Sequence, residues 1–153
     1  MAYNVDLYEQ REQQVLSIRT RTSVDQLPEV LGKAYAEVMM YIDEIEEMAA
    51  DVPFVAYYNL DMQDLDIEAG FPVSQQLPGK GNIQSNIIPA GKYAEVMYKG
   101  AYKAIEPAYK AIMEWFPANN CEALGPAYEF YLNDPTDTDE DDLLTRILMP
   151  IKE

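Results

Sequence analysis

The chain has 153 residues, 48% of them hydrophobic, and its 11 basic and 27 acidic side chains give a formal net charge of -16. This hydrophobic content excludes general disorder, and the negative charge disfavours direct binding to nucleic acid. Because the sequence has no histidine, catalytic triads with histidine, His-ligated zinc and a histidine general base are all excluded. The single cysteine, Cys121, has no intrachain disulfide partner, which favours a reducing cytoplasmic location. We expect no signal peptide and no membrane span, since no apolar stretch of about 18 residues occurs.

The first half of the chain predicts a strand, a helix and two further strands. Gln14–Arg21 alternates apolar and polar residues, as a half-buried strand does. Pro28 suits the first turn of a helix, and the apolar residues that follow at three- and four-residue steps predict a helix over 28–49. Phe54–Leu60 and Asp64–Ser74 are predicted to form the remaining two strands.

The second half predicts the same order of elements. The segment Leu77–Asn82, which contains a proline and two glycines, indicates a linker. Ile83–Tyr98 is predicted as one long strand or two short ones, and a helix is expected near 103–117. Pro126–Asn133 and Leu143–Ile151 then supply two further strands.

The two halves look like a diverged duplication. A shift of 73 residues lays Phe54–Asp61 over Ala127–Asp134 and matches Ala56 with Glu129. Under the same comparison Phe71-Pro72 matches Met149-Pro150 after a small insertion.

The predicted fold class is α+β, with two strand-helix-strand-strand units related by pseudo-twofold symmetry. We expect one domain over 1–153, with a first half at about 12–76 and a second half at about 82–153. The sheets would be antiparallel, with the two main helices on one side and a ligand groove between the halves.

Glu129 is the most informative residue, because it interrupts an apolar, aromatic strand. Strand alternation places Ala127, Glu129 and Tyr131 on one face and Tyr128 and Phe130 on the other. If the Glu129 face is poorly hydrated, the carboxylate is a costly anion that a cation would stabilise. If that face is wet, Glu129 is an ordinary solvated acid.

Aromatic and methionine side chains provide the rest of a plausible pocket. The chain has 12 tyrosines, and tyrosine rings beside a carboxylate are typical of a site for an organic cation. Methionines, Met97 and Met149 among them, would add adaptable walls. The spacing of Asp137, Asp139 and Asp141 lacks the glycine and the final glutamate of a calcium loop, so we expect no metal site and no cofactor.

Several motifs of the second half resemble the GyrI-like (gyrase-inhibitor-like) small-molecule-binding domain, which is also the effector-binding domain of bacterial multidrug-responsive transcription regulators. These motifs are PAGKYA at 89–94, YKGAY at 98–102, Trp115, the run from Gly125 to Leu132, Asp134-Pro135 and Pro150. The resemblance implies the duplicated fold and a pocket for lipophilic, often cationic aromatic compounds. It implies that Glu129 is the central acid and that the aromatic walls are Phe54, Tyr58, Tyr93 and Tyr131.

Two functions from different classes agree with this resemblance. The first is a stand-alone cytoplasmic binding module, with small molecules as partners and no direct contact with nucleic acid or membrane. The second is a cofactor-free hydrolase of cyclopropane-bearing alkylators, with Glu129 as general base. Inhibition of DNA gyrase is a third alternative, and the sequence favours binding over catalysis.

Overall fold

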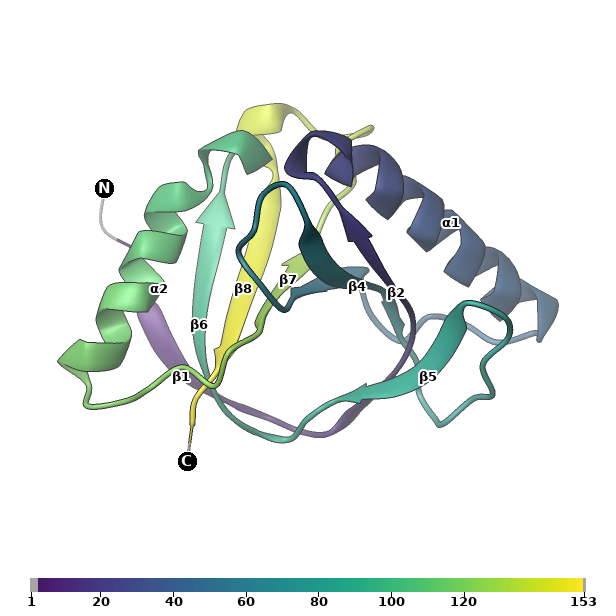
Figure 1. Cartoon of the computed structure of the whole chain (residues 1–153), viewed down its shortest axis with the longest axis horizontal. Coiled ribbons are helices and arrows are strands. Elements are labelled where there is room, and N and C mark those ends of the chain that lie inside the picture. Colours follow the sequence, from purple (N-terminus) through teal and green to yellow (C-terminus); the bar gives the residue numbers. More distant parts are fainter. Residues whose placement is uncertain (1–2, 153) are drawn as a thin grey trace. The chain divides into compact units, whose positions relative to one another are not determined.

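The computed structural model describes residues 3–152 and divides them into two compact units (Figure 1). Unit 1 comprises residues 3–10 and 91–152, and unit 2 comprises residues 11–90. All strand pairs within each unit are antiparallel. The α+β class and the two strand-helix-strand-strand units predicted from the sequence are therefore confirmed.

Unit 2 is a four-stranded sheet with one long helix, and the strand order is β3-β4-β2-β5. Its elements are β2 (Gln13–Thr22), η1 (Val24–Gln26), α1 (Leu27–Glu44), β3 (Phe54–Tyr57), β4 (Leu65–Pro72) and β5 (Ile83–Ile88). Helix α1 packs against β2 and β4. The helix ends at Glu44, five residues before the predicted position 49. Just after this end, Glu46 takes a left-handed backbone conformation with φ 58°.

Unit 1 repeats this plan with the strand order β1-β6-β8-β7. Its elements are β1 (Val5–Gln10), β6 (Gly91–Lys99), η2 (Tyr102–Ala104), α2 (Glu106–Ala118), β7 (Ala127–Tyr131), η3 (Glu140–Asp142) and β8 (Leu144–Pro150). Helix α2 packs against β6 and β1 (Figure 1). Pro107 lies in the first turn of α2, where its missing N–H costs nothing.

Each unit contains one edge strand that the predicted halves do not assign to it. β5 precedes β6 in the chain but pairs with β2 of unit 2, and β1 precedes β2 but pairs with β6 of unit 1. The predicted halves, about 12–76 and 82–153, therefore differ from the compact units by these two strands. β1 was not predicted, because its exposed and half-buried residues alternate without a strong apolar pattern.

Recurrent hydrogen bonds correct the alignment of the two units. The side chain of Asn59 accepts from the backbone N–H of Asp66, and the side chain of Asn133 accepts from that of Leu144. Each asparagine also donates to a nearby backbone carbonyl, so Asn59 corresponds to Asn133 with a shift of 74, from 59 to 133. The shift of 73 was one residue too short, and Val55 is therefore the counterpart of Glu129.

The predicted match of Phe71-Pro72 with Met149-Pro150 agrees with a backbone hydrogen bond that occurs at the same place in each unit. The backbone N–H of Ala50 donates to the carbonyl of Pro72, and that of Leu124 donates to the carbonyl of Pro150. The duplication is thus visible in both the order of elements and their backbone contacts.

Candidate functional site

Glu129 points toward helix α2. In the β7–β8 ladder it pairs with Ile147, which belongs to the apolar cluster that packs against Ala108 and Ile112 of α2. Directly paired residues on antiparallel strands share a face, so Glu129 and Tyr131 lie on this same face. Only 7% of Glu129 is exposed, which rules out the alternative of a solvated acid on a wet strand.

Two tyrosine hydroxyls hold the Glu129 carboxylate. Tyr109 on α2 donates to Oε2, and Tyr131 on β7 donates to Oε1 at 2.8 Å. None of the ion pairs within residues 3–152 includes Glu129. The carboxylate is therefore satisfied by neutral donors and lacks a countercharge from this part of the chain.

Burial controls the acidity of this group. Removal from water disfavours the anion and raises the pKa of Glu129 above its ordinary value, although the hydrogen bonds from Tyr109 and Tyr131 act in the opposite direction. Glu129 is thus a carboxyl whose charge depends on what contacts it.

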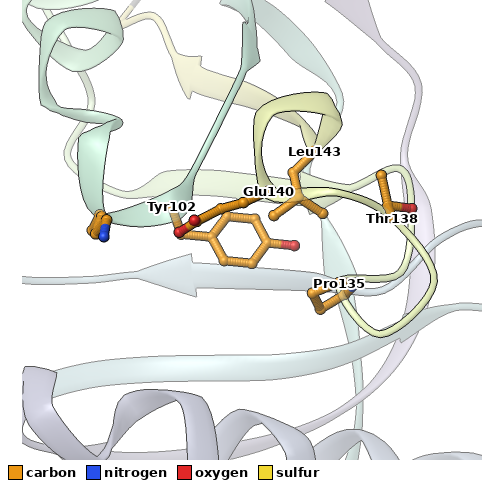
Figure 2. Close-up of a pocket in the computed structure, with 6 residues that line it drawn as sticks. Tyr102, Pro135, Thr138, Glu140 and Leu143 are labelled. Carbon is orange, nitrogen blue, oxygen red and sulfur yellow. The ribbon is translucent and has the colours of Figure 1, made fainter.

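A cavity of about 360 Å³ lies in the same unit, and Figure 2 shows the side chains around it. Tyr102, Pro135 and Leu143 provide its apolar surface, while Lys103, Thr138 and Glu140 add polar groups. Pro135 and Thr138 come from the loop between β7 and η3, and Tyr102 comes from η2. The cavity therefore combines an aromatic ring with side chains of both charges.

Tyr102 connects the cavity to the Glu129 network. Its ring centroid lies 5.2 Å from that of Tyr131, which donates to Glu129. Burial raises the pKa of Tyr102, and the negative charges of Asp134 and Glu129 raise it further. Tyr102, Tyr131, Glu129 and Tyr109 thus form one connected set that reaches the cavity through Tyr102, and we call it the tyrosine–glutamate network.

The structure brings together some of the residues expected at a site from the sequence. Glu129 and Tyr131 are in direct contact, and Met149 lies in the apolar cluster of the same unit. Tyr93 and Met97 alternate with Ala94 and Val96, which belong to that cluster, so they point to the opposite face of β6.

Two of the expected site residues, Phe54 and Tyr58, belong to unit 2. Phe54 is fully buried in β3, and its backbone carbonyl accepts a hydrogen bond from Tyr35 of α1. Tyr58 donates to Glu68 at 2.5 Å. The roles of all seven residues in ligand binding stay predictions.

Sequence reasoning missed Tyr109, Tyr102 and Glu68. Tyr109 fits the apolar stripe of α2, so the hydrophobic periodicity assigns it to the core and does not indicate a role for its hydroxyl. Glu68 alternates with Ile67 and Ala69, which is typical of a solvated strand face, but only 4% of it is exposed. The helpful signal was the excess of tyrosine, because buried hydroxyls require polar partners.

Comparison with known families identifies the domain. The family model of the GyrI-like small molecule binding domain matches residues 3–152. The chain belongs to this family. It is therefore a GyrI-like small-molecule-binding domain, as its sequence motifs predicted.

Solved structures show the same fold. The chain superposes on the EcmrR C-terminal domain with a TM-score of 0.84 and 22% identity, covering 100% of this chain and 99% of that one. In a cryo-EM structure of an EcmrR–DNA complex the TM-score is 0.88 at 21% identity, with 100% of this chain covered, and the chain spans 59% of the length of EcmrR.

Two further structures of similar fold are a hydrolase and a protein bound to a cationic ligand. A hydrolase from Listeria innocua gives a TM-score of 0.71 at 8% identity, covering 99% of this chain and 93% of that one. SAV2435 bound to tetraphenylphosphonium gives 0.69 at 13% identity, covering 99% of this chain and 94% of that one. No curated protein matches the chain in a sequence comparison.

Residues 3–152 contain no group of three metal-binding side chains arranged around a common point. The helices of this part of the chain are also too short or too polar to cross a membrane.

Proposed function

We propose that this GyrI-like domain binds lipophilic, cationic aromatic small molecules and that Glu129 supplies the countercharge. The observation that carries the proposal is the buried carboxylate of Glu129, held by two tyrosine hydroxyls and by no cation of residues 3–152. An isolated buried anion is costly, and the cost falls when a positive charge lies close to it in a poorly hydrated setting.

The aromatic residues of the tyrosine–glutamate network suit such a ligand. A ring in the cavity would stack on Tyr102, and a positive charge would gain from the faces of Tyr102 and Tyr131. Electron-rich rings attract a cation even before it contacts the carboxylate. The binding energy would therefore come mostly from apolar contact, with selection for charge coming from Glu129.

Access to Glu129 requires one of its tyrosine partners to move. Tyr109 is carried by α2, whereas the half-buried Tyr131 lies at the end of β7 next to the cavity. A ligand that enters from the cavity meets Tyr131 first. We therefore expect the hydroxyl of Tyr131 to be displaced while Tyr109 continues to donate to the carboxylate.

The comparison with SAV2435 supports the proposed ligand class. That protein is similar in fold and is bound to tetraphenylphosphonium, a cation whose charge is surrounded by four phenyl rings. At 13% identity the likeness concerns the fold alone, so the ligand class for this chain depends on the Glu129 geometry.

Isothermal titration with a matched pair of ligands tests the proposal. Methyltriphenylphosphonium carries a positive charge, and triphenylphosphine oxide is a neutral molecule of similar size. We expect Glu129→Gln to weaken the cation by roughly 1–3 kcal/mol, the scale of a charge-assisted contact, and to change binding of the oxide much less. Glu114→Gln, which removes an exposed carboxylate from the same helix as Tyr109, is the control for net charge. Equal losses for both ligands in Glu129→Gln would remove the countercharge role.

Hydrolysis is the second candidate, and the tyrosine–glutamate network favours it over other catalytic classes. A carboxylate with a raised pKa is a better general base near neutral pH than an ordinary glutamate. Glu129 would accept a proton from water as the oxygen bonds to a cyclopropane carbon. The electron pair of the broken ring bond would move into an electron-withdrawing group of the ligand, such as a conjugated carbonyl, and the resulting anion would take up the proton from Glu129. The similarity to a Listeria innocua hydrolase is consistent with this chemistry.

Turnover distinguishes the two candidates. A binding module converts at most one equivalent of a cyclopropane-bearing alkylator, whereas a hydrolase continues through many equivalents. If the domain is a hydrolase, Glu129→Gln should lower the rate by roughly 10²–10⁴, the contribution typical of a positioned general base. Turnover that is unchanged in this variant would exclude Glu129 as the base.

A further inference from the structure

A second buried carboxylate lies in unit 2, and it shares no hydrogen-bond partner with Glu129 among residues 3–152. Glu68 on β4 is 4% exposed. Its Oε1 accepts from the hydroxyl of Tyr58 at 2.5 Å, and its Oε2 accepts from Ser17 Oγ at 2.5 Å and from Asn86 Nδ2 at 2.9 Å. Three donors from separate parts of the sheet therefore converge on one carboxylate.

This network lies on the sheet face that α1 does not cover. Phe71 packs its ring against Tyr35 of α1, with centroids 5.7 Å apart, and Glu68 is three residues away on the same strand. Strand alternation therefore directs Glu68 to the other face. Asn86 is exposed and Tyr58 is half-buried, so the carboxylate lies just beneath accessible polar and aromatic groups.

A cation of the protein already occupies the aromatic surface beside Glu68. The guanidinium carbon of Arg19 lies 3.9 Å from the centroid of the Tyr58 ring. Arg19 pairs with Asp66 at 2.6 Å, and its side chain is 45% exposed. No ion pair within residues 3–152 joins Arg19 or any other basic side chain to Glu68.

The hydrogen-bond capacity of Glu68 leaves room for one more donor. A carboxylate has about four acceptor positions, and three donors reach this one. A planar cation on the Tyr58 ring could therefore both stack on the aromatic face and donate an N–H to Glu68. Arg19 performs the first of these two functions while its charge is paired with Asp66.

We propose that unit 2 contains a second ligand site, built from Glu68, Tyr58 and Asn86, which takes small aromatic amidinium or guanidinium compounds. The ligand replaces the Arg19 guanidinium on the Tyr58 ring and donates to the Glu68 carboxylate. Arg19 therefore competes with the ligand for the face of the Tyr58 ring and moves away from the ring when the ligand binds. The site does not depend on the Glu129 site and selects a planar N–H cation that carries hydrogen-bond donors.

NMR titration of the whole 15N-labelled protein with benzamidine tests this site, with neutral benzamide as the matched ligand. Benzamidine should shift the side-chain amide signals of Asn86, and benzamide should leave them in place. Glu68→Gln should weaken benzamidine at least tenfold, the effect of losing one charge-assisted contact. Glu37→Gln, which removes an exposed carboxylate from α1, should bind as the unchanged protein does.

Arg19→Ala provides a test that leaves the buried network intact. Removal of the resident cation should tighten benzamidine severalfold, because the ligand no longer competes for the Tyr58 ring. Benzamidine shifts at Asn86 that persist in Glu68→Gln, weaker binding in Arg19→Ala, or no shift in the unchanged protein would each overturn the proposal. Shifts at Asn86 that vanish in Glu129→Gln would also overturn it, because the ligand would then depend on the other site.

Discussion

Tyr109→Phe should destabilise the domain by an amount that grows with pH. The substitution removes one of the two hydroxyl donors to Glu129 and keeps the ring. When Glu129 is protonated, the lost interaction is neutral and costs about 0.5–1.5 kcal/mol, whereas a hydrogen bond to the ionised carboxylate is worth about 1.5–3 kcal/mol. The difference is about 1–1.5 kcal/mol, and it appears as a further rise in the pKa of Glu129.

The sign follows from the direction of that shift. The Tyr109 hydrogen bond lowers the pKa of Glu129 against the effect of burial, so its loss raises the pKa further and penalises the anion. The extra destabilisation is therefore absent at low pH and develops as pH rises through the folded-state pKa of Glu129.

Urea unfolding followed by Trp115 fluorescence measures this effect, because the single tryptophan lies on α2 with Tyr109. The free energy of unfolding should be compared across the acid-to-neutral range for the parent, Tyr109→Phe, Glu129→Gln and the double variant. In the Glu129→Gln background the cost of Tyr109→Phe should not change with pH. A cost that is the same at every pH in the parent background would refute the idea that Tyr109 stabilises an ionised Glu129.

Two further substitutions test the packing around these sites. Thr145→Val should stabilise the domain by about 1 kcal/mol, because the Thr145 hydroxyl is 0% exposed and has no hydrogen-bond partner within residues 3–152; a loss of thermal stability would show that the hydroxyl is satisfied in solution. Gly70→Ala should destabilise by about 3 kcal/mol or more, because a Cβ at this position would lie 2.0 Å from the backbone oxygen of Leu16; an unchanged melting temperature would contradict this close strand contact.

Most of the fold could be predicted from the hydrophobic periodicity and from the prolines and glycines that bound helices and strands. The strand at Gln14–Arg21 and the helix after Pro28 each carry a local signal, and the structure places elements at both. Ile83–Tyr98 forms two short strands, one of the two predicted alternatives. β1 carries no such signal, because its pairing with β6 depends on residues more than eighty positions away. The exchange of edge strands between the chain halves is likewise a property of long-range pairing that local patterns do not contain.

The candidate site was predictable only in part. Glu129 and Tyr131 share a strand face by alternation, and the structure joins them by a hydrogen bond. Tyr109 reaches Glu129 from a helix, and Glu68 collects donors from three segments. Such contacts depend on how helices and strands pack, so neither residue type nor spacing in the sequence identifies them.

The raised pKa of Glu129 also leads us to expect opposite pH dependences for the stability of the domain and for ligand binding. In the empty domain its pKa is raised, so its contribution to stability is present below the ordinary glutamate pKa and is lost as pH rises through the folded-state value. A bound cation favours the anion. The association constant for methyltriphenylphosphonium should therefore increase over the same pH range, by up to tenfold per pH unit, while the free energy of unfolding falls. Titration calorimetry and urea unfolding in matched buffers would show both trends, and Glu129→Gln should lose both together. A rising stability with a flat affinity would mean that Glu129 is ionised and satisfied by its tyrosines, which would leave the cation without its counterion.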